Sequence, residues 1–201
     1  MKLYFSPGAG SLAPRIALIA AGLPFESELV NLRTKVTASG DDFRAINAKG
    51  YVPALALDDG RLVTETQVIL QYVADQAPDS ALAPAHGTFE RYGLMEWLSW
   101  TSTELHKRFS PIFAPGASKE AKEAAWANLA APLTYVADQI GADGYLIGDR
   151  FTVADAYLFT VLNWVGFTRF SLESWPALQA YQARIRTLPA VQEGLRQEGL
   201  R

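Results

Sequence analysis

The segment VPALALDDGRLVTET, which spans residues 52–66, shows the clearest local pattern in the chain. Its first six residues are mostly apolar and predict a strand, with Pro53 near the start, where a missing backbone N–H is tolerated. Asp58-Asp59-Gly60 is a turn sequence typical of a β-hairpin, and Arg61–Val63 supplies the second strand. Residues 65–76 place apolar side chains three and four apart, so the segment predicts a β-hairpin followed by a helix.

The residues before this hairpin alternate between strand and helix patterns. Lys2–Phe5 and Phe25–Leu32 are predicted strands, and a helix that Ser11 can cap lies between them. A short helix near Asp41–Ile46 comes next. The predicted order over the first 76 residues is therefore βαβαββα, which makes an α/β domain.

Residues 77–87 hold Pro78 and Pro84 among small and polar residues and predict a linker. Everything after them has helical periodicity. The predicted helices are Thr88–Lys107, Lys119–Ile140, Thr152–Thr168, Trp175–Thr187 and one that begins near Pro189. We expect the internal Pro132 to kink the second of these helices. The sequence thus predicts an α/β domain over residues 1–80 and an all-helical domain over residues 88–201.

The 201 residues include no cysteine and only two histidines. Disulfides, iron–sulfur clusters, cysteine–zinc sites and a thiol nucleophile on the protein are thereby excluded, and so is a three-histidine metal site. Hydrophobic residues make up 49% of the chain and charged residues 19%, which indicates a globular protein with a real core. The net charge of −3 argues against nucleic acids and anionic membranes as partners.

No segment is predicted to span a membrane or to direct secretion. The Pro7-Gly8 break interrupts the N-terminus before the apolar region of a signal peptide can form. The charge-free apolar run Ala156–Thr168 is too short for a bilayer, and we interpret it as a buried core helix. Thr152 and Asp155 have the spacing of a capping box at its start. We expect a soluble, cytoplasmic protein.

Four places in the sequence each allow a structural and a functional interpretation. Val52-Pro53 is either a plain turn or a cis-proline that exposes the Val52 backbone to an extended, peptide-like ligand. Glu65-Thr66 either only caps a helix or binds the zwitterionic head of an amino acid at the helix N-terminus. Ser11 is either only a cap or also a donor to a thiolate. His106 is either a structural histidine or part of a site.

Several short motifs, spread over essentially the whole chain, resemble the bacterial beta class of glutathione S-transferases. They are Met1–Tyr4, Ser6–Ala9, Ser11–Ala13, Asn47–Gly50, Val52–Leu55, Thr64-Glu65, Glu104–Lys107 and Phe151–Tyr157. The resemblance implies a thioredoxin-like N-terminal domain, an all-helical domain that forms the electrophile pocket and part of a dimer interface, and a homodimer. It also implies glutathione as the co-substrate, with no tightly bound cofactor.

The same resemblance implies which residues form the site. Glu65 and Thr66 match the pair that holds the γ-glutamyl head of glutathione, Val52 matches the residue that pairs with the cysteinyl backbone, and Lys35 matches the residue near the glycyl carboxylate. The implied glutathione-binding residues are Gly10, Lys35, Val52, Glu65, Thr66, Ser99 and Thr103, and the implied catalytic residues are Ser11 and His106.

Two positions depart from the family pattern. Gly10 stands where the beta class usually has cysteine, and Phe5 stands where some members have tyrosine. Ser11, His106 and the backbone N–H groups of the Gly10–Ser11 turn remain as groups that can stabilise the glutathione thiolate. Lowering a thiol pKa by about two units requires roughly 2.7 kcal/mol. One or two hydrogen bonds to the charged sulfur supply that much, at about 1.5–3 kcal/mol each.

We therefore predict a glutathione transferase that joins glutathione to small hydrophobic electrophiles in a pocket between the two domains. Phe109, Phe113 and Trp164 are candidates for the wall of that pocket. Two alternatives stay open: another glutathione-dependent reaction on the same fold, such as isomerisation or dehalogenation, and a protein that binds hydrophobic compounds without catalysis.

Overall fold

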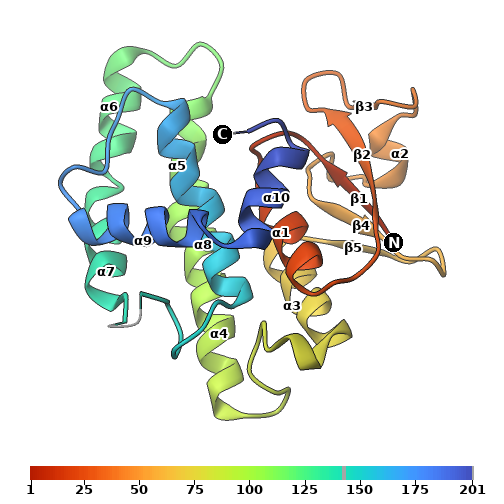
Figure 1. Cartoon of the computed structure of the whole chain (residues 1–201). Coiled ribbons are helices and arrows are strands. Elements are labelled where there is room, and N and C mark those ends of the chain that lie inside the picture. Colours follow the sequence, from red (N-terminus) through yellow and green to blue (C-terminus); the bar gives the residue numbers. More distant parts are fainter. Residues whose placement is uncertain (142–143, 201) are drawn as a thin grey trace.

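A five-stranded sheet in the order β3-β2-β1-β4-β5 forms the N-terminal half of the molecule (Figure 1). The computed structural model describes residues 1–141 and 144–200. The elements of this half are β1 (Lys2–Phe5), α1 (Leu12–Ala20), β2 (Glu26–Asn31), β3 (Val36–Thr37), α2 (Phe43–Ile46), β4 (Ala54–Ala56), β5 (Leu62–Thr64) and α3 (Thr66–Gln76). β1 and β2 are parallel, and β4 and β5 form the predicted antiparallel hairpin. The predicted α/β class is confirmed.

The short strand β3 is an addition to the predicted order. It pairs with the end of β2, where Val30 lies opposite Thr37 and Asn31 opposite Val36. Lys35 makes the turn between them in a left-handed conformation with φ of 60°, and its backbone N–H donates to the carbonyl of Asn31 at 2.8 Å. A strand of two residues shows no alternation in the sequence, so periodicity does not reveal it.

Helices alone make up the second half of the described chain. They are α4 (Phe89–Trp100), the π-helical segment η2 (Thr101–His106), α5 (Lys107–Phe113), α6 (Lys119–Ala127), α7 (Ala130–Gln139), α8 (Val153–Asn163), the short 3₁₀ helix η3 (Trp164–Phe167), α9 (Pro176–Arg186) and α10 (Pro189–Gln197). A 3₁₀ turn, η1 (Pro78–Ser80), lies in the predicted linker. The predicted all-helical class of this half is confirmed.

Two helices differ from their predicted bounds. The helix that begins at Phe89 continues beyond Lys107 to Phe113, because η2 and α5 follow α4 without a break. The segment predicted as one kinked helix over residues 119–140 is two helices. Proline cannot donate to the carbonyl four residues earlier and clashes with it, so Pro132 forces the first helix to end near Asn128 and takes a place in the first turn of α7.

Helix α8 is the centre of the core, since every one of its residues is buried. The predicted capping box begins it. One carboxylate oxygen of Asp155 accepts the backbone N–H and the hydroxyl of Thr152, both at 2.9 Å. The other accepts the N–H of Leu146 and the hydroxyl of Tyr181, both at 3.0 Å. Burial raises the pKa of Asp155, and these four donors act in the opposite direction.

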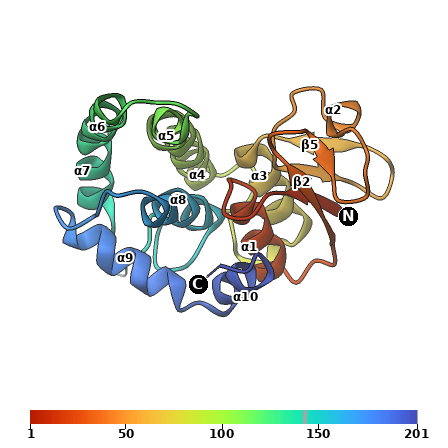
Figure 2. The ribbon, with the colours of Figure 1, turned by 90° about the horizontal axis from the view of Figure 1, so that it is seen from above.

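The two halves pack through α1, which lies against α3 on one side and against α8 and α10 on the other (Figure 2). The loop between β1 and α1 is tied to the helical half at the peptide groups of Gly8. The N–H of Gly8 donates to Glu198 at 2.8 Å, and its carbonyl accepts from the indole N–H of Trp164 at 2.7 Å. A Cβ at this left-handed position would meet the ring of Phe167 at 3.0 Å, so glycine is required there.

Glu198 also forms the buried ion pair of this contact. Its second carboxylate oxygen accepts from Nε of Arg15 at 2.9 Å, and both side chains are almost completely buried. Burial raises the pKa of Glu198, while the bonds from Gly8 and Arg15 favour its ionised form.

Within residues 1–141 and 144–200, no helix has the length and apolar character that crossing a bilayer needs.

We expect Glu198→Ala to lower the free energy of unfolding by about 3–5 kcal/mol, because it leaves the Arg15 guanidinium buried without its partner. Urea denaturation followed by far-ultraviolet circular dichroism measures the change. Glu193→Ala is the matched control, since Glu193 on α10 pairs with Arg196 at the surface, and exposed pairs contribute little. Equal stabilities of the two variants would contradict the proposed importance of the buried pair.

Candidate active site

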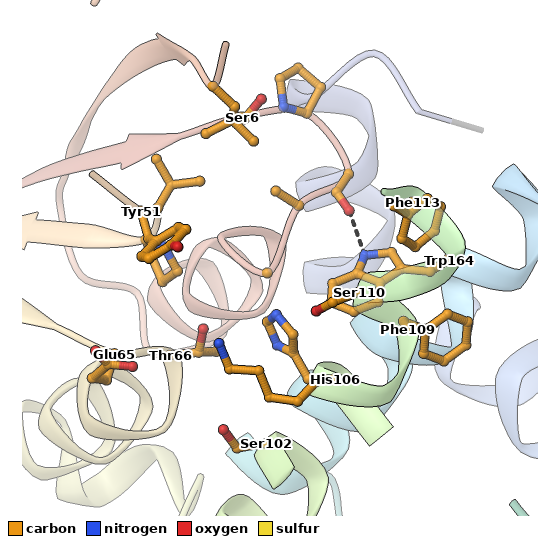
Figure 3. Close-up of a pocket in the computed structure, with 18 of the residues that line it drawn as sticks. Ser6, Tyr51, Glu65, Thr66, Ser102, His106, Phe109, Ser110, Phe113 and Trp164 are labelled. Atoms are coloured by element: carbon orange, nitrogen blue, oxygen red, sulfur yellow. Dashed lines mark hydrogen bonds between the residues drawn. The ribbon is translucent and has the colours of Figure 1, made fainter. Parts of the chain in front are cut away.

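A cavity of about 1020 Å³ opens between the sheet half and the helical half. Figure 3 shows that its lining side chains come from segments far apart in the sequence. The N-terminal half contributes the β1–α1 loop and the residues at the starts of β4 and α3, and the helical half contributes η2, α5, η3 and the C-terminal segment. Of the nine residues predicted for the site, six line the cavity: Gly10, Lys35, Val52, Glu65, Thr66 and His106.

The polar side of the cavity is formed by the N-terminal half. Val52 precedes a cis peptide bond to Pro53 at the start of β4, and Glu65 and Thr66 begin α3. Glu65 has a φ of 72°, which is rare for a residue with a side chain. Because a backbone in this region costs energy, its presence at the edge of a cavity indicates a constraint that is connected with function.

Three charged groups, those of Lys35, Lys49 and Glu65, line this side. Nζ of Lys49 lies 2.6 Å from the carboxylate of Glu65 and 3.0 Å from the hydroxyl of Thr64. Nζ of Lys35 donates to the carbonyl of Gly50 at 2.8 Å and lies 5.5 Å from the ring centre of Tyr51. Ammonium and carboxylate groups at this spacing suit a ligand that carries both charges, such as the ends of a small peptide.

Lys49 and Tyr51 were not predicted as site residues. Lys49 belongs to the Asn47–Gly50 motif, but a lysine in a polar loop is usually a solvated charge, and the sequence does not show that it meets Glu65. Tyr51 is an exposed aromatic residue next to two lysines, Lys35 and Lys107, whose Nζ atoms lie 5.5 and 5.9 Å from its ring centre. Only the fold brings these groups together.

His106 lies at the middle of the cavity floor, at the end of η2. Its Nδ1 is 2.8 Å from the hydroxyl of Tyr157, and its ring meets that of Trp164 edge to face with 4.6 Å between centroids. A Cβ at Gly10 would lie only 3.0 Å from its Cε1 atom. The imidazole therefore packs directly against the backbone of Gly10 and occupies the space beside it.

The pKa of His106 is lowered to about 4, chiefly because the ring is buried and also because the Lys107 ammonium is near. The carboxylate of Glu65 acts in the opposite direction. His106 is consequently a neutral imidazole at physiological pH, with one nitrogen that donates and one that accepts a hydrogen bond.

Three of the predicted site residues do not line the cavity. Ser11 is fully buried, and its hydroxyl accepts from the N–H of Ser6 and donates to the carbonyl of Ser6, each at 3.2 Å, instead of capping α1. Ser99 and Thr103 are exposed on the outer side of α4 and η2, and the hydroxyl of Thr103 donates to the carbonyl of Ser99 at 3.3 Å. Their roles remain predictions.

Aromatic side chains form the opposite, apolar wall of the cavity. Phe109, Phe113 and Trp164 pack together, with 5.6 Å between the centroids of Phe109 and Trp164 and 6.1 Å between those of Phe113 and Trp164. Phe167 and Leu200 extend this wall. The cavity therefore has a charged compartment for a polar ligand and an apolar compartment beside it, with His106 between them.

Comparison with known proteins gives the same family for both halves. Residues 11–76 match the model for the N-terminal domain of glutathione S-transferases, and residues 100–189 match that for the C-terminal domain. The chain is 44% identical to the glutathione S-transferase GstA of Escherichia coli O157:H7, with both chains covered completely.

Two solved structures are similar over the full length of both chains. A bacterial beta class glutathione S-transferase of Sphingomonas chungbukensis is 45% identical, with a TM-score of 0.96. A sphingomonad glutathione S-transferase complexed with glutathione is 44% identical, with a TM-score of 0.95.

We expect the stability of the protein to depend on the protonation of His106. Between the ordinary pKa of 6.5 and about 4, the unfolded chain binds a proton at this residue that the folded protein does not bind. The free energy of unfolding should therefore fall as the pH falls through this window, by roughly 3 kcal/mol in total from this group. Urea denaturation at a series of pH values measures the slope.

A His106→Gln variant should lose this part of the pH dependence. His86→Gln is its control, because His86 is the second histidine of the chain and is exposed in the linker. The parent protein and His106→Gln could instead show the same slope of unfolding free energy against pH between pH 4 and 6.5. In that case folded and unfolded chains protonate His106 equally readily, and the prediction is wrong.

Proposed function

The chain belongs to the glutathione S-transferase family, and we propose that it joins reduced glutathione to small apolar electrophiles in the cavity between its two halves. The observation that supports this function is the division of the cavity into a charged compartment and an aromatic compartment, with a neutral imidazole between them. The similarity to the bacterial beta class extends over the whole chain.

We place glutathione along the charged compartment. Glu65 and Thr66 hold the γ-glutamyl head, the backbone of Val52 pairs with the cysteinyl residue, and Lys35 lies near the glycyl carboxylate. The sulfur then lies beside Gly10, close to His106. Residues 1–80 act in this proposal as the glutathione-binding domain, and residues 88–201 provide the pocket for the electrophile.

Catalysis in this proposal requires that the bound thiol lose its proton to solvent, so that the sulfur can bond to an electrophilic carbon as the leaving group departs. His106 donates a hydrogen bond to the thiolate, and the N–H groups at the start of α1 add positive potential. Ser11 is a second proposed donor, and its hydroxyl has to leave the backbone of Ser6 to reach the sulfur.

Gly10 stands where the beta class usually has cysteine. The chain contains no cysteine, so it cannot form a mixed disulfide with glutathione, and the sulfur chemistry belongs to the bound glutathione alone.

We also propose a cytoplasmic location, because the reducing cytosol keeps glutathione in its thiol form.

We propose that the protein is a homodimer whose interface includes the outer side of α4. Phe89, Tyr92 and Met95 follow one another at helical spacing there, and Phe89 is 85% exposed. Ser99 and Thr103 lie further along the same side of the helix. In the proposed dimer, these two residues lie at the glutathione site of the partner subunit. This explains why they do not line the cavity of their own chain.

We expect the protein to catalyse conjugation of a chromogenic aryl halide only when glutathione is present. Glu65→Gln should weaken glutathione binding, measured by calorimetry, by about 1.5–3 kcal/mol, since it replaces the charged acceptor of the γ-glutamyl ammonium with a neutral one. Asp59→Asn is the control, because Asp59 also pairs with a basic residue at the surface but lies outside the cavity. Glutathione binding without turnover would instead support the non-catalytic alternative.

In analytical ultracentrifugation at micromolar concentration, we expect about twice the chain mass of 22.0 kDa. Phe89→Glu should shift the protein to the monomer and weaken glutathione binding, because it places a charge in the interface. Leu29→Glu introduces the same charge at an exposed apolar residue of β2 and should leave the dimer intact. A monomeric parent protein would refute the proposed contribution of Ser99 and Thr103.

A further inference from the structure

Tyr157, on helix α8, lines the cavity beside His106 and is only 2% exposed. Its hydroxyl is 2.8 Å from Nδ1 of His106, and the two rings meet edge to face. The side chains of Ser102 and Thr66 also face this hydroxyl. Figure 3 shows these two residues beside His106. The hydroxyl thus connects the proposed γ-glutamyl site with the imidazole beside Gly10.

The chemistry of the neighbouring groups determines the direction of this hydrogen bond. Burial raises the pKa of Tyr157 to about 12, so the phenol keeps its proton at physiological pH. A neutral imidazole nitrogen is a stronger acceptor than the hydroxyl oxygens of Ser102 and Thr66, and those hydroxyls can donate to the phenol oxygen. The phenol proton therefore goes to Nδ1 of His106, which must then lack a proton of its own.

The neutral imidazole carries one proton, and this arrangement places it on Nε2. Among the residues that the structure describes, Nε2 has no hydrogen-bond partner, and the ring borders the cavity. The charged groups that act on His106 are Lys107, the next residue in the chain and the first of α5, and Glu65, which directly precedes α3. Trp164 and Gly10, which pack against the ring, carry no charge.

We propose that Tyr157 is a positioning residue for the transferase reaction, and that its hydroxyl holds His106 in the tautomer whose Nε2–H donates to the sulfur of glutathione. The proposal rests on the proposed function, since it assigns a role to His106 in that reaction. In the other tautomer Nε2 would present a lone pair to the anionic sulfur and repel it. Tyr157 acts through His106 and does not itself touch the sulfur.

The tautomer can be measured without any activity. The chain has two histidines, so a His86→Ala variant leaves His106 as the only imidazole. We expect its ¹H–¹⁵N correlation spectrum at neutral pH to show the Nε2–H form. The Nδ1–H form, or a mixture of the two forms, would overturn the proposal. Because this measurement needs neither substrate nor the Tyr157 variant, its outcome is separate from that of the conjugation assay.

Tyr157→Phe tests the consequence for the reaction. We expect kcat at neutral pH to fall about tenfold, which corresponds to about 1.4 kcal/mol, with little change in KM for glutathione. The apparent thiol pKa of bound glutathione, followed by thiolate absorbance, should rise. Adding the change to His106→Ala should cause no further loss, because Tyr157 acts only through the imidazole.

Tyr181→Phe is the matched control. It also removes a buried phenol hydroxyl, one that donates to Asp155 on α8, and Tyr181 lies outside the cavity. It should lower stability without moving the thiol pKa. If Tyr157→Phe leaves the thiol pKa unchanged, or if its effect adds fully to that of His106→Ala, the positioning role is wrong. A Tyr157→Phe protein that does not fold leaves the tautomer measurement on the parent residue as the deciding result.

Discussion

Side chains of the helical half form hydrogen bonds to both the N–H and the carbonyl of Gly8, and the geometry of the site depends on this contact. Glu198 accepts the N–H and Trp164 donates to the carbonyl, while the ring of Phe167 fills the space where a side chain would begin. The loop from Ser6 to Gly10 therefore cannot move independently of the helices. Because α1 starts directly after this loop, the contact also sets how the sheet half meets α8 and α10.

One consequence of this packing is the close approach of Gly10 and His106. The loop brings the backbone of Gly10 to the imidazole, and the absence of a side chain at residue 10 leaves the space that the ring uses. Trp164 contributes to both contacts, since its indole N–H binds Gly8 and its ring packs on His106. A single aromatic residue thus positions the loop and the imidazole relative to each other, which is the kind of preorganisation that electrostatic catalysis needs.

Burial also decides how His106 can act. A charged imidazolium is disfavoured where water is excluded and Lys107 is near, so the residue is neutral. In the proposed reaction it therefore acts through the direction of its remaining N–H. The pairing of Lys49 with Glu65 at the open edge is different, because both groups stay half exposed and can exchange partners when a ligand arrives. The cavity thus combines a rigid, neutral floor with a charged rim that can adapt.

Local patterns in the sequence determined the order of elements in the sheet half apart from β3, the hairpin at Asp58-Asp59-Gly60 and the capping box of Thr152 and Asp155, because each depends on residues close together in the chain. Tertiary structure alone decided the rest. Ser11 looked like a helix cap, and its hydroxyl bonds Ser6 instead. Tyr157 and His106 are 51 residues apart and Gly8 and Glu198 are 190 apart. Contacts at such separations form only when the two halves pack, and no periodicity or spacing in the sequence records which side chains then meet.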